Sequence, residues 1–398
     1  MSLAGDQLGL FGAPEDDRVR PAPASEPLRE LGRRAPDRLF CGTCSWSFPG
    51  WSGLVYDREH PGRRLARDGL AAYAEHPLLS AVSVDHSFYG PPKEADWRRL
   101  GARLPRRFRC LVKAHELCTT ARLPELARFG SRRGRRNPLV LDASYASEVV
   151  IGPLVAGLGP ERGILLLQFP PQDPGAFGGP SGFAGRLEAF LTDVKPAMPV
   201  AVELRTPALL TSEYVEVLRR TGATHAWSVH PTMPTPREQA RRLGVPDATF
   251  SPCAAPGVPA CGPPEGLAER DVAGSTQTGE VAPAVDQDKA ARPSRDKAGG
   301  PTALEGRRSA ARTGGRAPMV LRWMLRRDLR YDEAKARFAP FDRRAAPDST
   351  MSEELRRLAA AGLRSGREVV LTVNNKAEGS APLSITSWLE DLVEELGL

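Results

Sequence analysis

A membrane-spanning helix needs about 18 consecutive apolar residues, and the sequence of 398 residues has no such run. We therefore expect no membrane span. Its first residues lack a basic start followed by a long apolar stretch, which argues against a secretory signal. These two absences favour the cytoplasm. No internal repeat of useful length is visible, so a solenoid or propeller architecture is not indicated.

Cysteine and histidine are also scarce, with six residues of each type. Cys41 and Cys44 form a C-x-x-C pair, but no second pair follows at zinc-ribbon spacing, and the pair does not open a helix that would lower a thiol pKa. We therefore expect structural thiols, with zinc or redox chemistry as the alternative.

Candidate metal ligands are scattered along the chain. No H-x-H or H-x-x-x-H pair occurs, and the sequence indicates no metal site and no cofactor. The alternative is a metal held by residues from several loops, namely His86, His115, His230, Glu203 and Asp142.

What the chain does contain is a series of eight short apolar runs, each followed by glycine, proline or a helix-like stretch. Strands that alternate with helical crossovers predict an α/β fold, here a (β/α)8 TIM barrel. The runs are Arg38–Trp46, Ala81–Phe88, Phe108–Ala114, Gly163–Phe169, Pro199–Arg205, Ala223–His230, Met319–Met324 and Glu368–Asn375.

Two segments cannot contribute to such a core. Residues 1–36 are rich in proline, alanine, glycine and charge, which predicts a disordered tail. Residues 250–317 are poor in aromatic and large aliphatic side chains, which predicts a disordered insert between the sixth and seventh strands. The expected organisation is one barrel domain over residues 37–398, interrupted by this insert.

Polar residues gather where the predicted strands end, the place at which barrels carry their chemistry. They are His86, Lys113, Gln168, Glu203, Arg205, Arg322 and Asn374. Side chains alternate along a strand, so parity turns Ser83, Asp85, Lys113, Gln168, Glu203, Arg205, Arg322, Thr372 and Asn374 toward the barrel interior or its mouth.

The mouth then holds Lys113, Arg205 and Arg322 against Glu203 and Asp85. One interpretation is a closed layer of salt bridges that plugs the barrel. The other is a site for an anionic, phosphorylated small molecule or a nucleic-acid end. In that site Glu203 is a general base, Lys113 a catalytic or anion-binding group, Arg322 an anion contact and Asn374 an orienting group. The reaction is not named by these residues, and a non-catalytic binding or scaffold protein is the rival hypothesis.

Aromatic residues follow the first strand closely. These aromatic residues could form one wall of a pocket. Trp46 and Tyr89 are candidate ligand contacts, as are Asp85, Gln168 and Arg205 at the strand ends. The alternative is that these aromatic residues are loop core. The full set is Trp46, Phe48, Trp51, Tyr56, Phe88 and Tyr89.

The net charge of +7 is unevenly distributed. Residues 105–136 contain ten basic side chains against Glu116 and Glu125, a segment charge of +8. Such a segment can bind nucleic acid through phosphates, or it can be a solvated surface. The candidate contacts are Arg132, Arg133, Arg135 and Arg136.

The tail carries one apolar pentapeptide, Gln7-Leu-Gly-Leu-Phe11. It resembles the Q-L-[S/D]-L-F motif with which bacterial polymerases and repair proteins dock on the DNA sliding clamp. In that role Leu8, Leu10 and Phe11 fill an apolar pocket and Gln7 makes polar contacts. The alternatives are a chance match or a tail that folds back on its own barrel.

Six further motifs, in order over roughly residues 38–390, resemble the YecE-like family, also called domain of unknown function 72. They are Cys41-Gly-Thr-Cys-Ser-Trp-Ser-Phe, Ser87-Phe-Tyr, Phe108-Arg-Cys-Leu-Val-Lys-Ala, Leu166-Leu-Gln-Phe-Pro-Pro, Val202-Glu-Leu-Arg and Val373-Asn-Asn-Lys-Ala-Glu-Gly-Ser-Ala-Pro. The resemblance implies a TIM barrel and no established activity.

The sequence departs from this family at three places. Cys44 stands where the family has glycine, and Ser83-Val-Asp85 replaces E-I-N, so the carboxylate expected at position 83 is missing. The seventh strand keeps Arg322 but lacks the R-x-H-G pattern.

Overall fold

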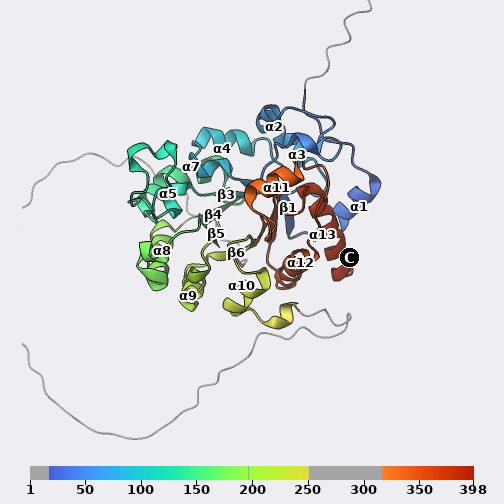
Figure 1. Cartoon of the computed structure of the whole chain (residues 1–398). Helices are drawn as coiled ribbons and strands as arrows, with labels where there is room; N and C mark the ends of the chain where they lie inside the picture. The colour runs from blue at the N-terminus through green and yellow to red at the C-terminus, as the bar shows by residue number, and fades with distance from the viewer. Residues whose placement is uncertain (1–17, 196, 251–315) are drawn as a thin grey trace, which may run out of the picture. The chain divides into compact units, whose positions relative to one another are not determined.

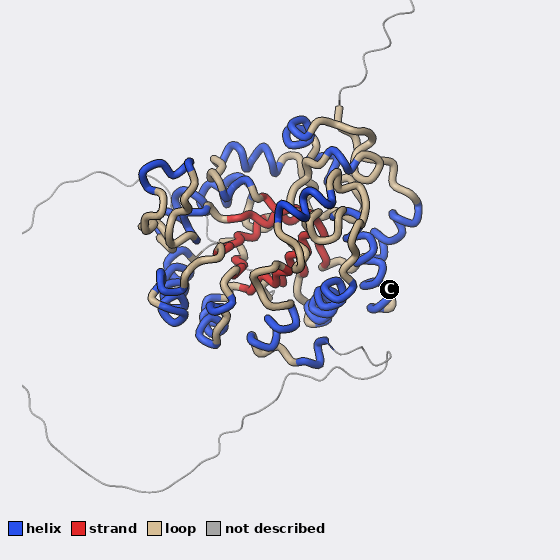
Figure 2. Tube along the Cα trace, viewed as in Figure 1, coloured by secondary structure: helices blue, strands red, loops and turns tan. Residues whose placement is uncertain are grey.

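The computed structural model of the protein describes residues 18–195, 197–250 and 316–398. Eight parallel strands close into a barrel in chain order, which confirms the predicted fold. The strands form the centre and helices lie around them (Figures 1 and 2). The strands are β1 (Leu39–Thr43), β2 (Ala81–Val84), β3 (Arg109–Lys113), β4 (Gly163–Phe169), β5 (Val200–Leu204), β6 (Thr224–Val229), β7 (Met319–Trp323) and β8 (Val369–Val373).

The helical layer consists of α-helices with short 3-10 and π segments between them. The α-helices are α1 (Glu26–Arg34), α2 (Gly62–Asp68), α3 (Leu70–Ala74), α4 (Glu94–Gly101), α5 (Glu116–Thr119), α6 (Ala143–Tyr145), α7 (Gly152–Leu158), α8 (Gly179–Val194), α9 (Ser212–Thr221), α10 (Pro236–Arg242), α11 (Tyr331–Phe338), α12 (Ser349–Arg364) and α13 (Ala381–Leu396). The other segments are η1 (Pro49–Trp51), η2 (His86–Phe88), η3 (Ala127–Arg132), η4 (Ala146–Ile151), η5 (Pro174–Phe177), η6 (Pro207–Leu209) and η7 (Asp247–Phe250). None of the helices in these described ranges is long and apolar enough to cross a membrane.

Each strand is apolar on both faces because the barrel has two separate apolar layers. In β5, Val200, Val202 and Leu204 belong to the layer between strands and helices, whereas Ala201 belongs to the barrel interior. The interior layer consists of Phe40, Ala81, Leu111, Ile164, Leu166, Ala201, Ala226, Val320 and Val370. Burial on both faces explains why the strands read as continuous hydrophobic runs rather than as alternating ones.

The barrel interior changes from apolar to polar toward the carboxyl ends of the strands. Two residues after an interior apolar residue, and hence on the same face, seven strands carry a polar side chain. These side chains are Ser83, Lys113, Gln168, Glu203, Ser228, Arg322 and Thr372. The remaining strand, β1, has Gly42 at this position. A Cβ there would lie 1.8 Å from the carbonyl oxygen of Ala81, so only glycine allows the close approach of β1 and β2.

The predicted tail needs a correction over residues 18–36. The backbone N–H of Ala22 donates to the carbonyl of Val55 at 2.9 Å, and α1 begins after Ser25, whose hydroxyl accepts from Leu28 N–H. Leu31 is 6% exposed and belongs to the main core, and Arg34 Nε donates to the carbonyl of Leu398 at 3.1 Å. The local signals of the helix are Ser25 at the N-cap, Glu26 and Pro27 in the first turn and two arginines in the last turn. The prediction missed it because the composition of the whole segment, rich in proline, alanine, glycine and charge, favours disorder.

The other predicted segment lies almost wholly outside the described residues. The described chain continues to Phe250, which is buried at the end of η7, and resumes at Arg316 before β7. Phe250 therefore belongs to the barrel domain rather than to the insert.

Candidate functional site

Glu203 is the centre of the polar layer at the barrel mouth. Its side chain is fully buried, and its two carboxylate oxygens contact Nη2 of Arg205 and Nε of Arg322, the latter at 3.0 Å. The Glu203 oxygens and Arg322 Nε are not aligned for a hydrogen bond, so the contact between Glu203 and Arg322 is mainly ionic. One carboxylate thus neutralises part of the charge of two buried guanidinium groups.

The same charges set the protonation of Glu203. Burial would raise the pKa of this carboxyl, but Arg205, Arg322 and Lys113 outweigh burial and hold the pKa below its ordinary value. Glu203 is therefore ionised at neutral pH. Because it has no exposed surface, it cannot touch a ligand in this conformation, and its predicted role as general base would require one arginine to move.

Asp85 is linked to the guanidinium group of Arg322 by hydrogen bonds through the Ser83 hydroxyl. Nη1 of Arg322 donates to the Ser83 hydroxyl at 3.1 Å, and that hydroxyl donates to Oδ1 of Asp85 at 2.7 Å. The same carboxylate oxygen lies 3.9 Å from Arg322 Nη2. The negative charge missing at position 83 is thus supplied from position 85, with the serine as a relay.

Lys113, at the end of β3, differs from both arginines. No carboxylate among the described residues lies within ion-pair distance of its ammonium group, which instead sits 4.0 Å from the centre of the Phe88 ring. Burial lowers the pKa of Lys113, and the positive charges of Arg322 and Arg205 lower it further. The negative charges of Asp85 and Glu203 raise it, but do not offset the other effects. Lys113 is half-buried, so a ligand at the mouth can reach it.

The β8 side of the mouth is built around Asn374. Its side-chain oxygen accepts from the backbone N–H of Lys376 at 3.0 Å and lies 3.5 Å from the Lys376 ammonium group. That ammonium also lies 4.4 Å from the centre of the Tyr331 ring. Sequence reasoning missed Lys376, although its place directly after the strand-end pair Asn374-Asn375 was an available signal.

Comparison with known families fits this architecture. The model for the family described as protein of unknown function DUF72 matches residues 40–397. The chain belongs to the DUF72 family. The resemblance drawn from six sequence motifs is therefore confirmed, together with the barrel it implied.

Solved structures similar to this DUF72 protein are themselves DUF72 family proteins. One, from Enterococcus faecalis V583, has 14% sequence identity and a TM-score of 0.45, with 89% of this chain and 95% of that chain covered. Another, from Thermotoga maritima MSB8, has 14% identity and a TM-score of 0.44, with 89% and 98% covered. No curated protein matches the chain.

The strand-end residues of this DUF72 protein divide into a buried and a half-exposed set. Glu203, Arg205 and Arg322 are buried, whereas Asp85, Lys113, Gln168 and Asn374 retain exposed surface. The closed ionic layer, the first of the two predicted alternatives, is present, and it lies beneath the half-exposed side chains at the rim of the mouth. The ligand site stays a prediction.

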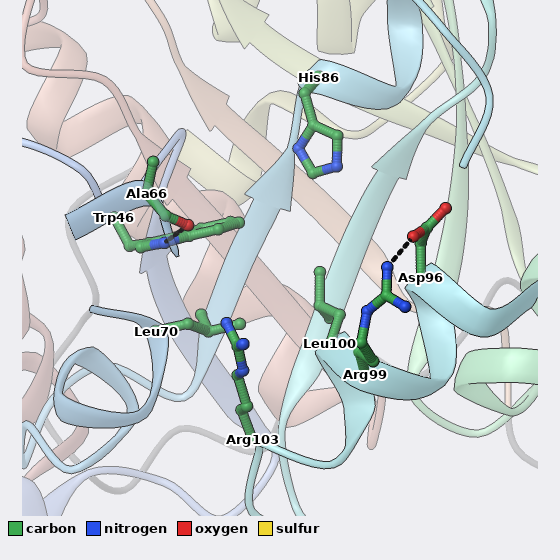
Figure 3. A pocket seen from close by; sticks show the side chains of 8 residues that line it. All are labelled: Trp46, Ala66, Leu70, His86, Asp96, Arg99, Leu100 and Arg103. Carbon is green, nitrogen blue, oxygen red and sulfur yellow. Dashed lines mark hydrogen bonds and ion pairs between the residues drawn. The ribbon is translucent and has the colours of Figure 1, made fainter. Parts of the chain in front are cut away.

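Trp46 and His86 line a pocket to which none of these strand-end residues contributes. Figure 3 shows both side chains facing a pocket of about 170 Å³, with Leu70 from α3 and Leu100 from α4. Nε1 of Trp46 donates to the carbonyl of Leu65 at 3.1 Å, which fixes the indole toward α2. The imidazole of His86 meets the indole edge-on at 6.4 Å between ring centres, and partial burial lowers its pKa.

The remaining aromatic residues do not form one wall. Trp51 and Tyr56 are fully buried in the main core, and Phe48 packs on Trp51 with ring centres 4.9 Å apart. These three residues are loop core, the second of the two predicted alternatives. Tyr89, by contrast, is 65% exposed.

The cysteines of the described ranges are buried free thiols. Burial raises the pKa of Cys41 and of Cys44 to about 12, so neither is a thiolate at neutral pH. Within the same ranges no three His, Cys, Asp or Glu side chains form a group that could hold a metal ion. The predicted clamp-binding residues Gln7, Leu8, Leu10 and Phe11 lie outside the described residues, as do Cys253 and Cys261.

Proposed function

We propose that the barrel mouth binds a small phosphorylated or carboxylated molecule, with Lys113 as its main contact. The observation that carries this proposal is the partly desolvated ammonium of Lys113, which has no carboxylate partner among the described residues. A buried cation without a counter-charge is costly, and an anionic ligand would remove that cost.

The neighbouring groups define what else the ligand would carry. Asp85 is an acceptor at the rim, and Gln168 and Asn374 offer amide groups on adjoining parts of the mouth. An anionic group toward Lys113 and a hydroxyl or amine toward Asp85 would match this arrangement. A hydroxylated phosphate or carboxylate, such as a sugar phosphate, has this chemistry.

If the protein is an enzyme, Lys113 is the candidate general base or nucleophile because it combines a lowered pKa with access from the rim. Glu203 then acts indirectly by fixing Arg205 and Arg322 beneath the ligand. If the protein only binds, the same ligand is held without turnover.

The test replaces Lys113 with methionine, which keeps the length of the side chain and removes its charge. Calorimetric titration with inorganic phosphate, pyrophosphate and glycerol phosphate should show affinity for at least one of them. Lys113→Met should weaken it about tenfold or more, about 1.4 kcal/mol. Lys335→Met, on an exposed face of α11, is the matched control and should bind as wild type. Equal affinity of the Lys113→Met and wild-type proteins would overturn the proposal.

A second function, docking on a bacterial sliding clamp, is favoured by the pentapeptide Gln7–Phe11. A peptide covering residues 1–20 should bind a clamp with micromolar affinity, about −7 to −8 kcal/mol. The double change Gln7→Ala with Phe11→Ala should abolish binding, measured by fluorescence anisotropy. Lack of binding by the full-length protein at about 100 μM clamp would remove this function.

A further inference from the structure

The segment that follows β3 and α5 forms an arginine hairpin, defined here as residues 121–137. Its two arms pair through the backbone: Leu123 N–H donates to the Arg135 carbonyl at 2.9 Å and Gly134 N–H to the Leu123 carbonyl at 3.0 Å. The buried side chain of Asn137 donates to the carbonyls of Leu117 and Thr120 at 2.8 and 2.7 Å. The hairpin is therefore a defined element with an anchored base.

Most arginines of the hairpin have no acidic partner. Arg128 pairs with Glu116 at 2.6 Å and thereby ties the hairpin to α5. Among the residues that the structure describes, no carboxylate forms an ion pair with the five other arginines, all of them exposed: Arg122, Arg132, Arg133, Arg135 and Arg136. Elsewhere in the described chain some exposed arginines pair with glutamates, such as Arg29 and Arg219, and single ones such as Arg337 do not. The hairpin differs because it gathers five arginines without a described carboxylate partner in one segment.

A hollow of about 390 Å³ lies at the base of the hairpin. It is lined by Arg136, Asn137, Pro138 and, from α8, Arg186. Burial and the neighbouring charge of Arg136 both lower the pKa of Arg186. Two guanidinium groups that repel each other across one hollow would both be stabilised by a phosphate placed between them.

Large apolar side chains are exposed beside these charges. Tyr89 is 65% exposed and Leu126, within the hairpin, is 45% exposed. The guanidinium carbon of Arg128 lies 5.5 Å from the centre of the Tyr89 ring, so the ring and the hairpin are adjacent. An exposed aromatic ring beside a row of basic side chains is the arrangement on which single-strand binding proteins stack bases.

We propose that the arginine hairpin and Tyr89 bind single-stranded nucleic acid. The phosphodiester backbone would cross Arg132, Arg133 and Arg135 and enter the hollow between Arg136 and Arg186. A base would stack on Tyr89, which requires a strand whose base faces are free, as in single-stranded DNA or RNA. Tyr89 adjoins the rim through Phe88, whose ring centre lies 5.3 Å from that of Tyr89 and 4.0 Å from the Lys113 ammonium. The arginines of the proposal lie on the hairpin and on α8, so the phosphate contacts do not depend on the small-molecule site.

The experiment measures fluorescence anisotropy of labelled 20-nucleotide oligo-dT, oligo-U and a 20-base-pair duplex, titrated with the full chain over a range of salt concentrations. Single strands should bind more tightly than the duplex. A variant with Arg132, Arg133, Arg135 and Arg136 changed to alanine should lose at least about thirtyfold in affinity near 0.1 M salt. The slope of log K against log salt should become less steep by about 3, since each phosphate contact contributes about 0.7.

The matched control changes Arg29, Arg33, Arg219 and Arg337, four exposed arginines on α1, α9 and α11, to alanine, with the same loss of charge. It should keep most of the affinity and the wild-type slope. Tyr89→Ala should weaken single-strand binding about tenfold without a change of slope, and Tyr89→Phe should restore it. Lys113→Met should weaken phosphate binding but leave the slope of log K against log salt for nucleic acid unchanged, which separates this proposal from the previous one.

Equal loss of binding in the hairpin variant and the control would show only a general effect of charge and overturn the proposal. The proposal also fails if the duplex binds as tightly as the single strands and Tyr89→Ala has no effect. Melting temperatures close to wild type are expected for the arginine and Tyr89 variants, because their altered side chains are exposed.

Discussion

At the scale of single residues, the two buried arginines at the barrel mouth are stabilised by neighbouring acidic and polar side chains. Arg322 has no exposed surface, yet Glu203, Ser83 and Asp85 all face it. The desolvation of so many charges is tolerable only while each has an opposite neighbour. Glu203 is thus first a structural counter-charge, whatever else it does.

This position predicts a stability effect for Glu203→Gln. The change leaves Arg205 and Arg322 buried without their shared carboxylate, so the free energy of unfolding should fall by about 3–5 kcal/mol. Urea denaturation followed by circular dichroism measures it. Asp85→Asn, at a half-exposed side chain, should cost about 1 kcal/mol or less. A Glu203→Gln protein as stable as wild type would contradict the ionic layer described here.

Sequence parity placed Glu203, Arg322 and Lys113 on the correct face because alternation along a strand needs no knowledge of neighbours. It could not show which cation would remain without a carboxylate, since that depends on distances between strands. Nor could it show that the indole of Trp46 is hydrogen-bonded to α2. That contact depends on a carbonyl of Leu65, nineteen positions along the chain.

At the scale of elements, the strands were predictable because each is a short apolar run with a polar end. The helix α1 was not predicted, although it packs on the core through Leu31. Its local signals, a serine N-cap and basic residues in the last turn, stand in a segment whose overall composition predicts disorder. The arginine hairpin was predicted as a charged segment, but its paired arms and its contact with Tyr89 are tertiary features.

The packing of α1 predicts that Leu31→Ala lowers the free energy of unfolding by about 2–3 kcal/mol, the usual cost of removing a buried leucine side chain at a well-packed site. Chemical denaturation gives the value. Arg29→Ala, on the exposed face of the same helix, should change stability by about 0.5 kcal/mol or less. If Leu31→Ala is as mild as Arg29→Ala, the helix contributes nothing to the fold.

At the scale of the whole molecule, stability should depend on pH through buried neutral histidines. His225 is buried on β6 with Nδ1 3.0 Å from the Tyr214 hydroxyl and Nε2 3.1 Å from the side-chain oxygen of Gln239. Burial lowers the pKa of His225 to about 4, against 6.5 for the ordinary group. Below pH 6.5 the unfolded chain binds a proton that the folded chain does not.

The free energy of unfolding should therefore fall as the pH decreases from 6.5 toward 4, by up to about 1.4 kcal/mol per pH unit for this residue. Urea denaturation at pH 7.5 and pH 5 measures the change. His225→Gln should reduce the dependence, although His76 and His230, whose pKa values are also lowered to about 4, will retain part of it. An identical pH dependence in wild type and variant would exclude His225 as a source.

The closure of the barrel joins the beginning of the folded domain to its end, with Leu39 opposite Val369 and Thr43 opposite Val373. During synthesis on the ribosome, β1 has only β2 as a neighbour until the last strand emerges. Its open edge is then a template to which strands of other chains can add. Contacts so distant in sequence also form slowly. Within the chain, this edge of β1 can therefore be paired only after residues 369–373 have been synthesised.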